Sequence, residues 1–128
     1  MSDLVSQNLN MIFKTPKGET VHALKDLNFT LKRGELLTVL GPSGCGKTTL
    51  LNITAGFIRP TSGSITLNNK EIDGPGVERG MVFQQGALFE WLTVAENVNF
   101  GLRMKKKDPI ETQKKVDEWL EIVGLKGF

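Results

Sequence analysis

The chain has 128 residues, of which 39% are hydrophobic, enough for the core of one domain or of part of one. Sixteen basic and fourteen acidic residues leave a net charge of +2, which argues against a nucleic-acid-binding protein dominated by phosphate contacts. The single cysteine excludes an internal disulfide, and no apolar run or signal peptide predicts membrane insertion or export. We therefore expect a cytoplasmic protein.

The chain before residue 34 predicts a set of antiparallel strands. Residues 9–13 alternate weakly as a first strand, and residues 15–18 form a hairpin turn. Residues 21–23 return, and residues 27–31 alternate as a half-buried strand. His22 has no carboxylate or thiol near it in sequence, so we interpret it as a structural residue.

A phosphate-binding loop follows these strands. The apolar residues 36–40 predict a buried strand that leads into residues 41–48, with the pattern G-x-x-x-x-G-K-T. Glycines let successive N–H groups turn toward phosphate oxygens, and the helix that follows points its positive end at the anion. Lys47 is placed to reach the β and γ phosphates, and the Thr48 hydroxyl to bind Mg²⁺. The predicted binding residues are Gly41, Pro42, Ser43, Gly44, Cys45, Gly46, Lys47, Thr48 and Thr49.

Beyond the loop helix, which we expect to end at Gly56, residues 64–67 and 81–83 predict two further strands. Gln84 follows the second of them. A polar side chain at this end of a parallel strand can lie beside the nucleotide or simply cap the strand. Phe13 also has two interpretations, because an aromatic before an exposed turn can pack in the core or stack on adenine.

The rest of the chain predicts two helices. Residues 86–92 carry large apolar side chains that either pack under the core or form an exposed patch for a partner. Thr93 and Glu96 form a capping box that opens the first helix, and Asp108 caps the second. The second helix carries an apolar stripe expected to face the core, formed by Val116, Trp119, Leu120 and Val123.

Together these stretches resemble the ATP-binding subunit of ATP-binding-cassette transporters, over nearly the whole chain. The residues look most like those of the importers of taurine, sulfonates and nitrate. The resemblance implies an α/β P-loop NTPase of the ABC ATPase type, with an antiparallel β-subdomain at about 1–34, a phosphate-loop core at 35–85 and the start of a helical subdomain at 86–128. The segments that carry it are ALKDLNFTLKRGELLTVLGPSGCGKTTLLN, AGFIRPTSGSITLN, GPGVERGMVFQ, ALFEWLTVAENV, FGL and VGL.

The resemblance also assigns roles to residues. Residues 41–49 correspond to the Walker A loop, Phe13 to the aromatic that stacks on adenine, and Gln84 to the Q-loop glutamine that touches Mg²⁺ and the attacking water. It implies ATP and Mg²⁺ as ligands, with Lys47 and Gln84 catalytic and Thr48 and Gln84 at the metal. A membrane permease subunit would dock on residues 88–92, at Leu88, Phe89 and Trp91.

The implied function is ATP binding and, in the full-length protein, hydrolysis that energises solute import by a homodimer on the inner face of the membrane. The family's signature motif does not follow Gly124, so we expect an amino-terminal part that does not hydrolyse ATP alone. The alternative is a non-catalytic nucleotide-binding or interaction module. A GTP switch fits poorly, because Ile72 stands where the guanine-reading aspartate of N-K-x-D would be.

Overall fold

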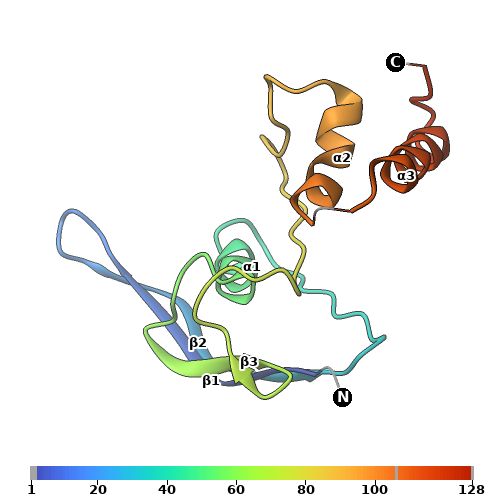
Figure 1. The fold of residues 1–128 in the computed structure, drawn as a ribbon. Helices are drawn as coiled ribbons and strands as arrows, with labels where there is room; N and C mark the ends of the chain where they lie inside the picture. Colours follow the sequence, from blue (N-terminus) through green and yellow to red (C-terminus); the bar gives the residue numbers. More distant parts are fainter. Residues whose placement is uncertain (1–2, 106, 128) are drawn as a thin grey trace. The chain divides into compact units, whose positions relative to one another are not determined.

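The computed structural model describes residues 3–105 and 107–127, which form two compact units, one up to Met81 and one from Val82. None of the helices in the described parts is long and apolar enough to cross a membrane. The predicted division at residues 34 and 85 stays a prediction. The first unit contains β1 (Leu4–Lys14), β2 (Thr20–Leu31), α1 (Lys47–Ala55), β3 (Ser62–Leu67) and β4 (Lys70–Glu71), and the second contains α2 (Val94–Met104) and α3 (Pro109–Ile122) (Figure 1).

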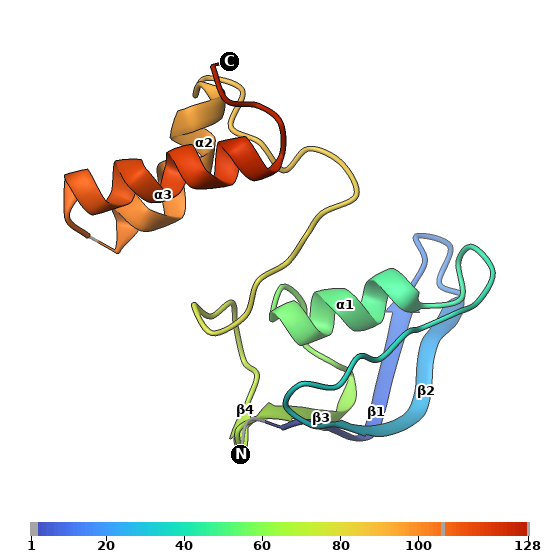
Figure 2. The ribbon, with the colours of Figure 1, turned by 90° about the vertical axis from the view of Figure 1, so that its right-hand side faces the viewer.

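The first unit is an antiparallel sheet with one helix on it. Its strand order is β2-β1-β3-β4, and α1 lies over one face of the sheet (Figure 2). Apolar side chains from the sheet and from α1 bury each other between the two layers, which is the main stabilising term of this unit. The core residues are Leu9, Leu24, Leu50, Ile53, Ile65 and Ile72.

The strands are longer than their sequence pattern predicts. β1 begins at Leu4 rather than at residue 9, and β2 is one strand where residues 21–23 and 27–31 predict two. The cause is a left-handed residue in each strand, Asn8 with φ 47° and Asp26 with φ 43°, which interrupts the alternation of facing side chains. The alternation of apolar and polar residues in the sequence therefore predicts only part of each strand.

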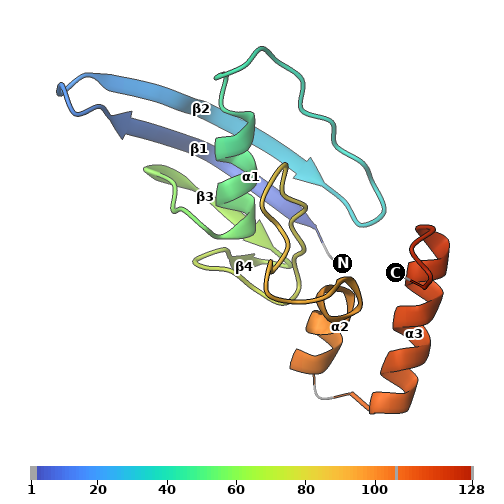
Figure 3. The same cartoon turned by 90° about the horizontal axis from the view of Figure 1, so that it is seen from above.

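Two predicted strands are absent from the described structure. Residues 36–40 and 81–83 are irregular, and Leu36 and Val82 are 91% and 96% exposed (Figure 3). A strand needs a neighbour for its N–H and C=O groups. In the described part of the chain no strand pairs with either segment, so the prediction of a buried strand at residues 36–40 is wrong for this structure.

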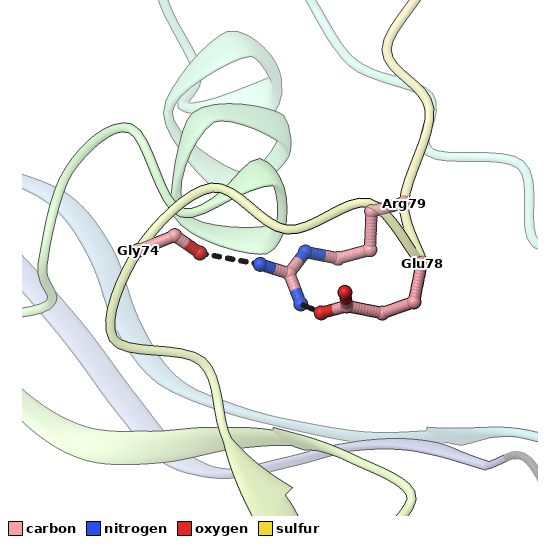
Figure 4. Close-up of polar contacts among 3 residues, drawn as sticks. All are labelled: Gly74, Glu78 and Arg79. Carbon is pink, nitrogen blue, oxygen red and sulfur yellow. Dashed lines mark hydrogen bonds and ion pairs between the residues drawn. The ribbon is translucent and has the colours of Figure 1, made fainter. Parts of the chain in front are cut away.

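The segment after β4 is held against the C-terminal end of α1. Gly56 ends the helix with φ 83°, as predicted, and a Cβ there would clash with the backbone of Gly74. The Arg79 guanidinium donates hydrogen bonds to the carbonyl oxygen of Gly74 and to the carboxylate of Glu78 (Figure 4). These contacts fix the backbone that leads out of the first unit.

The second unit is a pair of helices that pack against each other, and both begin as predicted. Thr93 and Glu96 form the capping box of α2, and hydrogen bonds from Thr93 hold the pKa of Glu96 below its ordinary value. The Asp108 carboxylate caps α3 by accepting from the N–H groups of Ile110 and Glu111.

The apolar stripe of α3 is only half buried. Val116 and Leu120 are in the interior of the unit, whereas Trp119 is 43% and Val123 64% exposed. The stripe was expected to face a core along its whole width. On the helix surface Trp119 and Val123 form a separate row from Val116 and Leu120, and it is the second row that is buried where α3 packs in this unit.

Candidate functional site

The phosphate loop occupies residues 41–46 and is followed directly by α1, which begins at Lys47. Gly46 is the N-cap with φ 100°, and no side chain caps the helix. The N–H groups of the first turn therefore keep their hydrogen-bonding capacity for an anion, which the helix dipole also favours. Cys45 donates its N–H to the Pro42 carbonyl at 3.3 Å and closes a turn within the loop.

The loop rests directly on the sheet. A Cβ on Gly46 would clash with the carbonyl oxygen of Ala23 and come within 3.1 Å of Leu24 Cδ2, so β2 and the loop are in contact at this glycine. Leu24 and Leu50 belong to the buried core on either side of the contact. The position of the loop is thus set by packing on β2 as well as by the motif itself.

The ammonium of Lys47 lies across the loop. Its Nζ donates to the carbonyl oxygens of Gly41 and Pro42 at 2.7 and 2.6 Å, and it lies 3.4 Å from the Sγ atom of Cys45. Charge-assisted hydrogen bonds of this length are strong. They keep the cation at the loop, where a phosphate oxygen can replace the carbonyls as its partner.

Phe13 and the phosphate loop line one pocket of about 240 Å³. Phe13 is 41% exposed and so offers part of its ring to a ligand instead of burying all of it in the core. Of the predicted residues, Gly41, Pro42, Ser43 and Cys45 are exposed and do not line this pocket. The pocket is lined by Phe13, Val21, Ala23, Gly44, Gly46, Lys47, Thr48 and Thr49.

Two lining residues, Val21 and Ala23, were missed by sequence reasoning. They belong to β2, and Val21 is the register partner of Phe13 in the ladder between β1 and β2. The pairing of a hairpin could have suggested Val21 once Phe13 was considered. Ala23 could not be found in this way, because it lies where the register between the two strands shifts.

Gln84 lies in the second unit, in exposed irregular backbone. Its role at Mg²⁺ and the attacking water stays a prediction. Among the described residues no group of three or more histidine, cysteine, aspartate or glutamate side chains could hold a metal ion. The Thr48 hydroxyl and the phosphates of a bound nucleotide suit Mg²⁺, which usually keeps several waters and takes few protein ligands.

The segment before α2 is organised by a residue that the sequence analysis did not single out. The Asn97 amide donates to the carbonyl oxygens of Phe89, Leu92 and Thr93 at 3.0 to 3.1 Å and accepts from the N–H of Phe89 at 2.9 Å. The signal in the sequence that could have identified Asn97 is an asparagine near the start of a helix that follows a loop of large apolar residues. Trp91 and Leu88 are 79% and 73% exposed, whereas Phe89 is half-buried, with its ring centroid 4.5 Å from that of Phe100.

Cys45 offers a direct test of where the ligand lies. Its thiol is exposed and close to Lys47, so we expect maleimide labelling to block MgATP binding sterically. Saturating MgATP should slow the labelling several-fold. The rate is followed by mass spectrometry, with Lys47→Ala as the control in which MgATP gives no protection. Equal labelling rates with and without MgATP in the unmodified chain would place the nucleotide elsewhere.

Comparison with known proteins gives the family. Residues 24–128 match the model of the ABC transporter family. The chain is 88% identical over 128 residues to the taurine import ATP-binding protein TauB of Pelagibacter ubique and 59% identical to that of Roseobacter denitrificans, covering all of this chain and 48% of each relative. It therefore spans about half the length of these relatives.

Solved structures agree with this result. The dimeric post-hydrolysis state of the ATP-binding cassette MJ0796, bound to ADP and Pi, is similar with a TM-score of 0.81 at 31% identity, over 97% of this chain and 58% of that one. A second dimeric structure of MJ0796, described as a bacterial ABC transporter cassette, gives a TM-score of 0.82. The predicted α/β fold of the ABC ATPase type is confirmed. The chain belongs to the ABC transporter family of ATP-binding proteins.

Proposed function

We propose that this chain binds MgATP in the pocket between Phe13 and the phosphate loop. The observation that carries the proposal is that one pocket joins an exposed aromatic face to the N-terminus of α1. Phe13 and Lys47 are far apart in sequence, and the sheet brings them to the same pocket. An aromatic surface beside an anion site suits a ligand with a planar base and a phosphate chain.

The residues that line the pocket suggest where each part of the nucleotide binds. Adenine stacks on Phe13, the phosphates accept from the loop N–H groups and from Lys47, and the Thr48 hydroxyl contributes to Mg²⁺. The structural neighbour that binds ADP and Pi supports a nucleotide as the ligand.

Titration calorimetry with MgATP and with magnesium tripolyphosphate tests this assignment. The unmodified chain should bind MgATP roughly tenfold more tightly than tripolyphosphate, because stacking adds about 1–3 kcal/mol per base. Phe13→Ala should remove that difference, while the matched variant Phe57→Ala, also an exposed aromatic of the same unit, keeps it. Unchanged MgATP affinity in Phe13→Ala would contradict the stacking role.

We further propose that the longer protein hydrolyses ATP to energise the import of taurine. The taurine import proteins that this chain matches at 88% and 59% identity support this solute. Phosphoryl transfer to water needs an acidic Mg²⁺ ligand and a positioned nucleophile. The described lining of the pocket contains Lys47 and Thr48 but no carboxylate, so we assign binding to this chain and hydrolysis to the longer protein, with Gln84 at the attacking water.

The proposed partners are a second ATP-binding subunit and a membrane permease, with the protein on the cytoplasmic face of the membrane. The dimeric neighbours support the first. For the second, Leu88 and Trp91 are exposed, Leu88 lines a pocket, and the Asn97 amide donates hydrogen bonds to the backbone of their segment. This pocket, of about 700 Å³, is lined by Leu88, Phe89, Glu90, Leu92, Val94, Asn97, Val98 and Leu125.

The docking proposal requires that Trp91 remain accessible in the purified chain. In a Trp119→Phe background, we expect red-shifted emission from Trp91 that acrylamide quenches efficiently, because its side chain is 79% exposed. The complementary Trp91→Phe variant, which reports Trp119 at 43% exposure, should be quenched less. Blue-shifted, quencher-resistant emission from Trp91 would show that it is buried and remove the docking surface.

A further inference from the structure

The hairpin that carries Phe13 shifts its register at three places, and the first two of these bulges lie on opposite strands next to each other. The ladder pairs Ser6 with Phe29, then Leu9 with Leu27, and then Met11 with Leu24. Between the first two pairs β1 has one residue more than β2, and between the next two β2 has one more than β1. The second shift thus compensates the first, and a third shift, between Met11 and Ile12, leaves Ala23 as a further extra residue in β2.

The bulge in β1 decides which face of the sheet Phe13 occupies. Leu4 and Ser6 point to the core side before the bulge, and Leu9 and Met11 point to the same side after it. Phe13 continues this second series and lines the pocket. Side chains alternate between faces, so an unbulged strand that kept Leu4 and Ser6 inside would turn Phe13 to the opposite face.

Two asparagines hold the bulged residues together, and we call Asn10 and Asn28 the asparagine clamp. Asn10 Nδ2 donates to the Asn8 carbonyl at 2.7 Å and to Asp26 Oδ1 at 3.4 Å, and Asn10 Oδ1 accepts from the Asp26 N–H at 3.0 Å. The Asn28 side chain, on the other strand, contacts the same two residues. It accepts from the Asn8 N–H and donates to the Asp26 carbonyl, both at 2.8 Å. Each clamp residue therefore joins both strands.

The clamp lies where the hairpin loses its third strand. Asn10 is the last residue of β1 that pairs with β3, opposite Ser62, and the hairpin continues past this point toward Phe13 (Figure 3). Farther along β1, the Thr61 hydroxyl accepts a hydrogen bond from the Ile12 N–H at 2.9 Å. The direction in which the free end leaves the sheet thus depends on the bulges and on what fixes them.

We propose that the asparagine clamp positions Phe13 over the phosphate loop, and that Asn10 is a positioning residue for adenine binding. The inference rests on the proposed MgATP site. Asn10 and Asn28 do not line the pocket, so they act through the geometry of the hairpin. The loop itself packs on β2 and continues into α1, so we expect substitutions in the clamp to leave its contacts with phosphate unchanged.

The test is the affinity of Asn10→Leu for MgATP and for magnesium tripolyphosphate, by calorimetry on the full chain. Asn10→Leu keeps the side-chain size and removes three hydrogen bonds, so we expect the affinity for MgATP to fall roughly tenfold. Tripolyphosphate affinity should stay within about twofold. Asn68→Leu, in the turn between β3 and β4, is the control for loss of an asparagine outside the hairpin. Asn68 has φ 55°, so leucine strains this turn, but neither affinity should change.

A double-mutant cycle separates positioning from general destabilisation. If Asn10 acts through Phe13, Asn10→Leu should cost nothing further in a Phe13→Ala background. Asn28→Leu, which opens the clamp from the other strand, should reproduce the result and serves if Asn10→Leu does not fold. Additive losses, or equal losses for MgATP and tripolyphosphate, overturn the positioning role while the MgATP site stands. An unmodified chain that does not prefer MgATP over tripolyphosphate overturns both proposals.

Discussion

Replacement of Lys47 by alanine is expected to lower the affinity for MgATP by roughly 100-fold or more, with the fold intact. The Lys47 ammonium supplies the positive charge among the residues that line the pocket, and it donates hydrogen bonds to carbonyl oxygens of the loop. A hydrogen bond to a charged group contributes about 1.5–3 kcal/mol, and Lys47 would make two of them to the β and γ phosphates. In the free protein its partners are exposed carbonyls of Gly41 and Pro42, which water can satisfy after the change.

Calorimetry at constant ionic strength measures this loss, and circular dichroism checks the fold. Lys32→Ala is the matched control, because it removes an exposed lysine of the same unit outside the pocket lining. Its affinity should stay within about twofold, since exposed charges at a distance are screened. If Lys47→Ala binds MgATP as tightly as the unmodified chain, the nucleotide does not occupy this loop.

Gly46→Ala is expected to abolish measurable MgATP binding and to destabilise the first unit. Two effects act together: φ at Gly46 is 100°, and the new Cβ would clash with the Ala23 carbonyl oxygen, a backbone atom that cannot rotate away. Left-handed backbone costs a non-glycine residue about 1–2 kcal/mol, and overpacking adds about 1–3 kcal/mol. The loop must leave β2 to relieve the clash, and the pocket then loses its shape.

Gly34→Ala is the matched control for backbone strain alone. Gly34 has φ 86°, and a Cβ there meets nothing within 4 Å. Gly34→Ala should lower the free energy of unfolding by only about 1–2 kcal/mol and leave the affinity for MgATP unchanged. Urea unfolding and calorimetry give the two quantities. Equal behaviour of the two variants would show that the contact between Gly46 and Ala23 does not hold the loop.

The features that the sequence predicted well are those built from neighbouring residues. The phosphate loop, the start of α1, the capping box at Thr93 and the cap at Asp108 each depend on hydrogen bonds or backbone angles within a few residues. Such interactions form in the same way whatever surrounds them. This is why the motif alone could predict Lys47 and Thr48 as site residues.

Features that depend on distant partners were not predictable in this way. Residues 36–40 have the composition of a buried strand, yet the backbone pairs only where a neighbour is present, and the described structure provides none. The alternation in β1 and β2 breaks at Asn8 and Asp26, and the bulge in β1 is compensated by the next bulge in β2. Neither strand read alone shows the compensation.

The sequence by itself determined the groups that the proposed chemistry uses: a glycine-rich loop, one lysine and one threonine hydroxyl at the start of a helix. Only the tertiary structure places Phe13 in the same pocket as Lys47 and Thr48, where we propose that it stacks on adenine. Its two interpretations, core packing or a face for adenine, had equal support from its neighbours. The choice depends on the face of the sheet to which the bulged hairpin turns the ring, which is set by register with β2 and by contacts between strands.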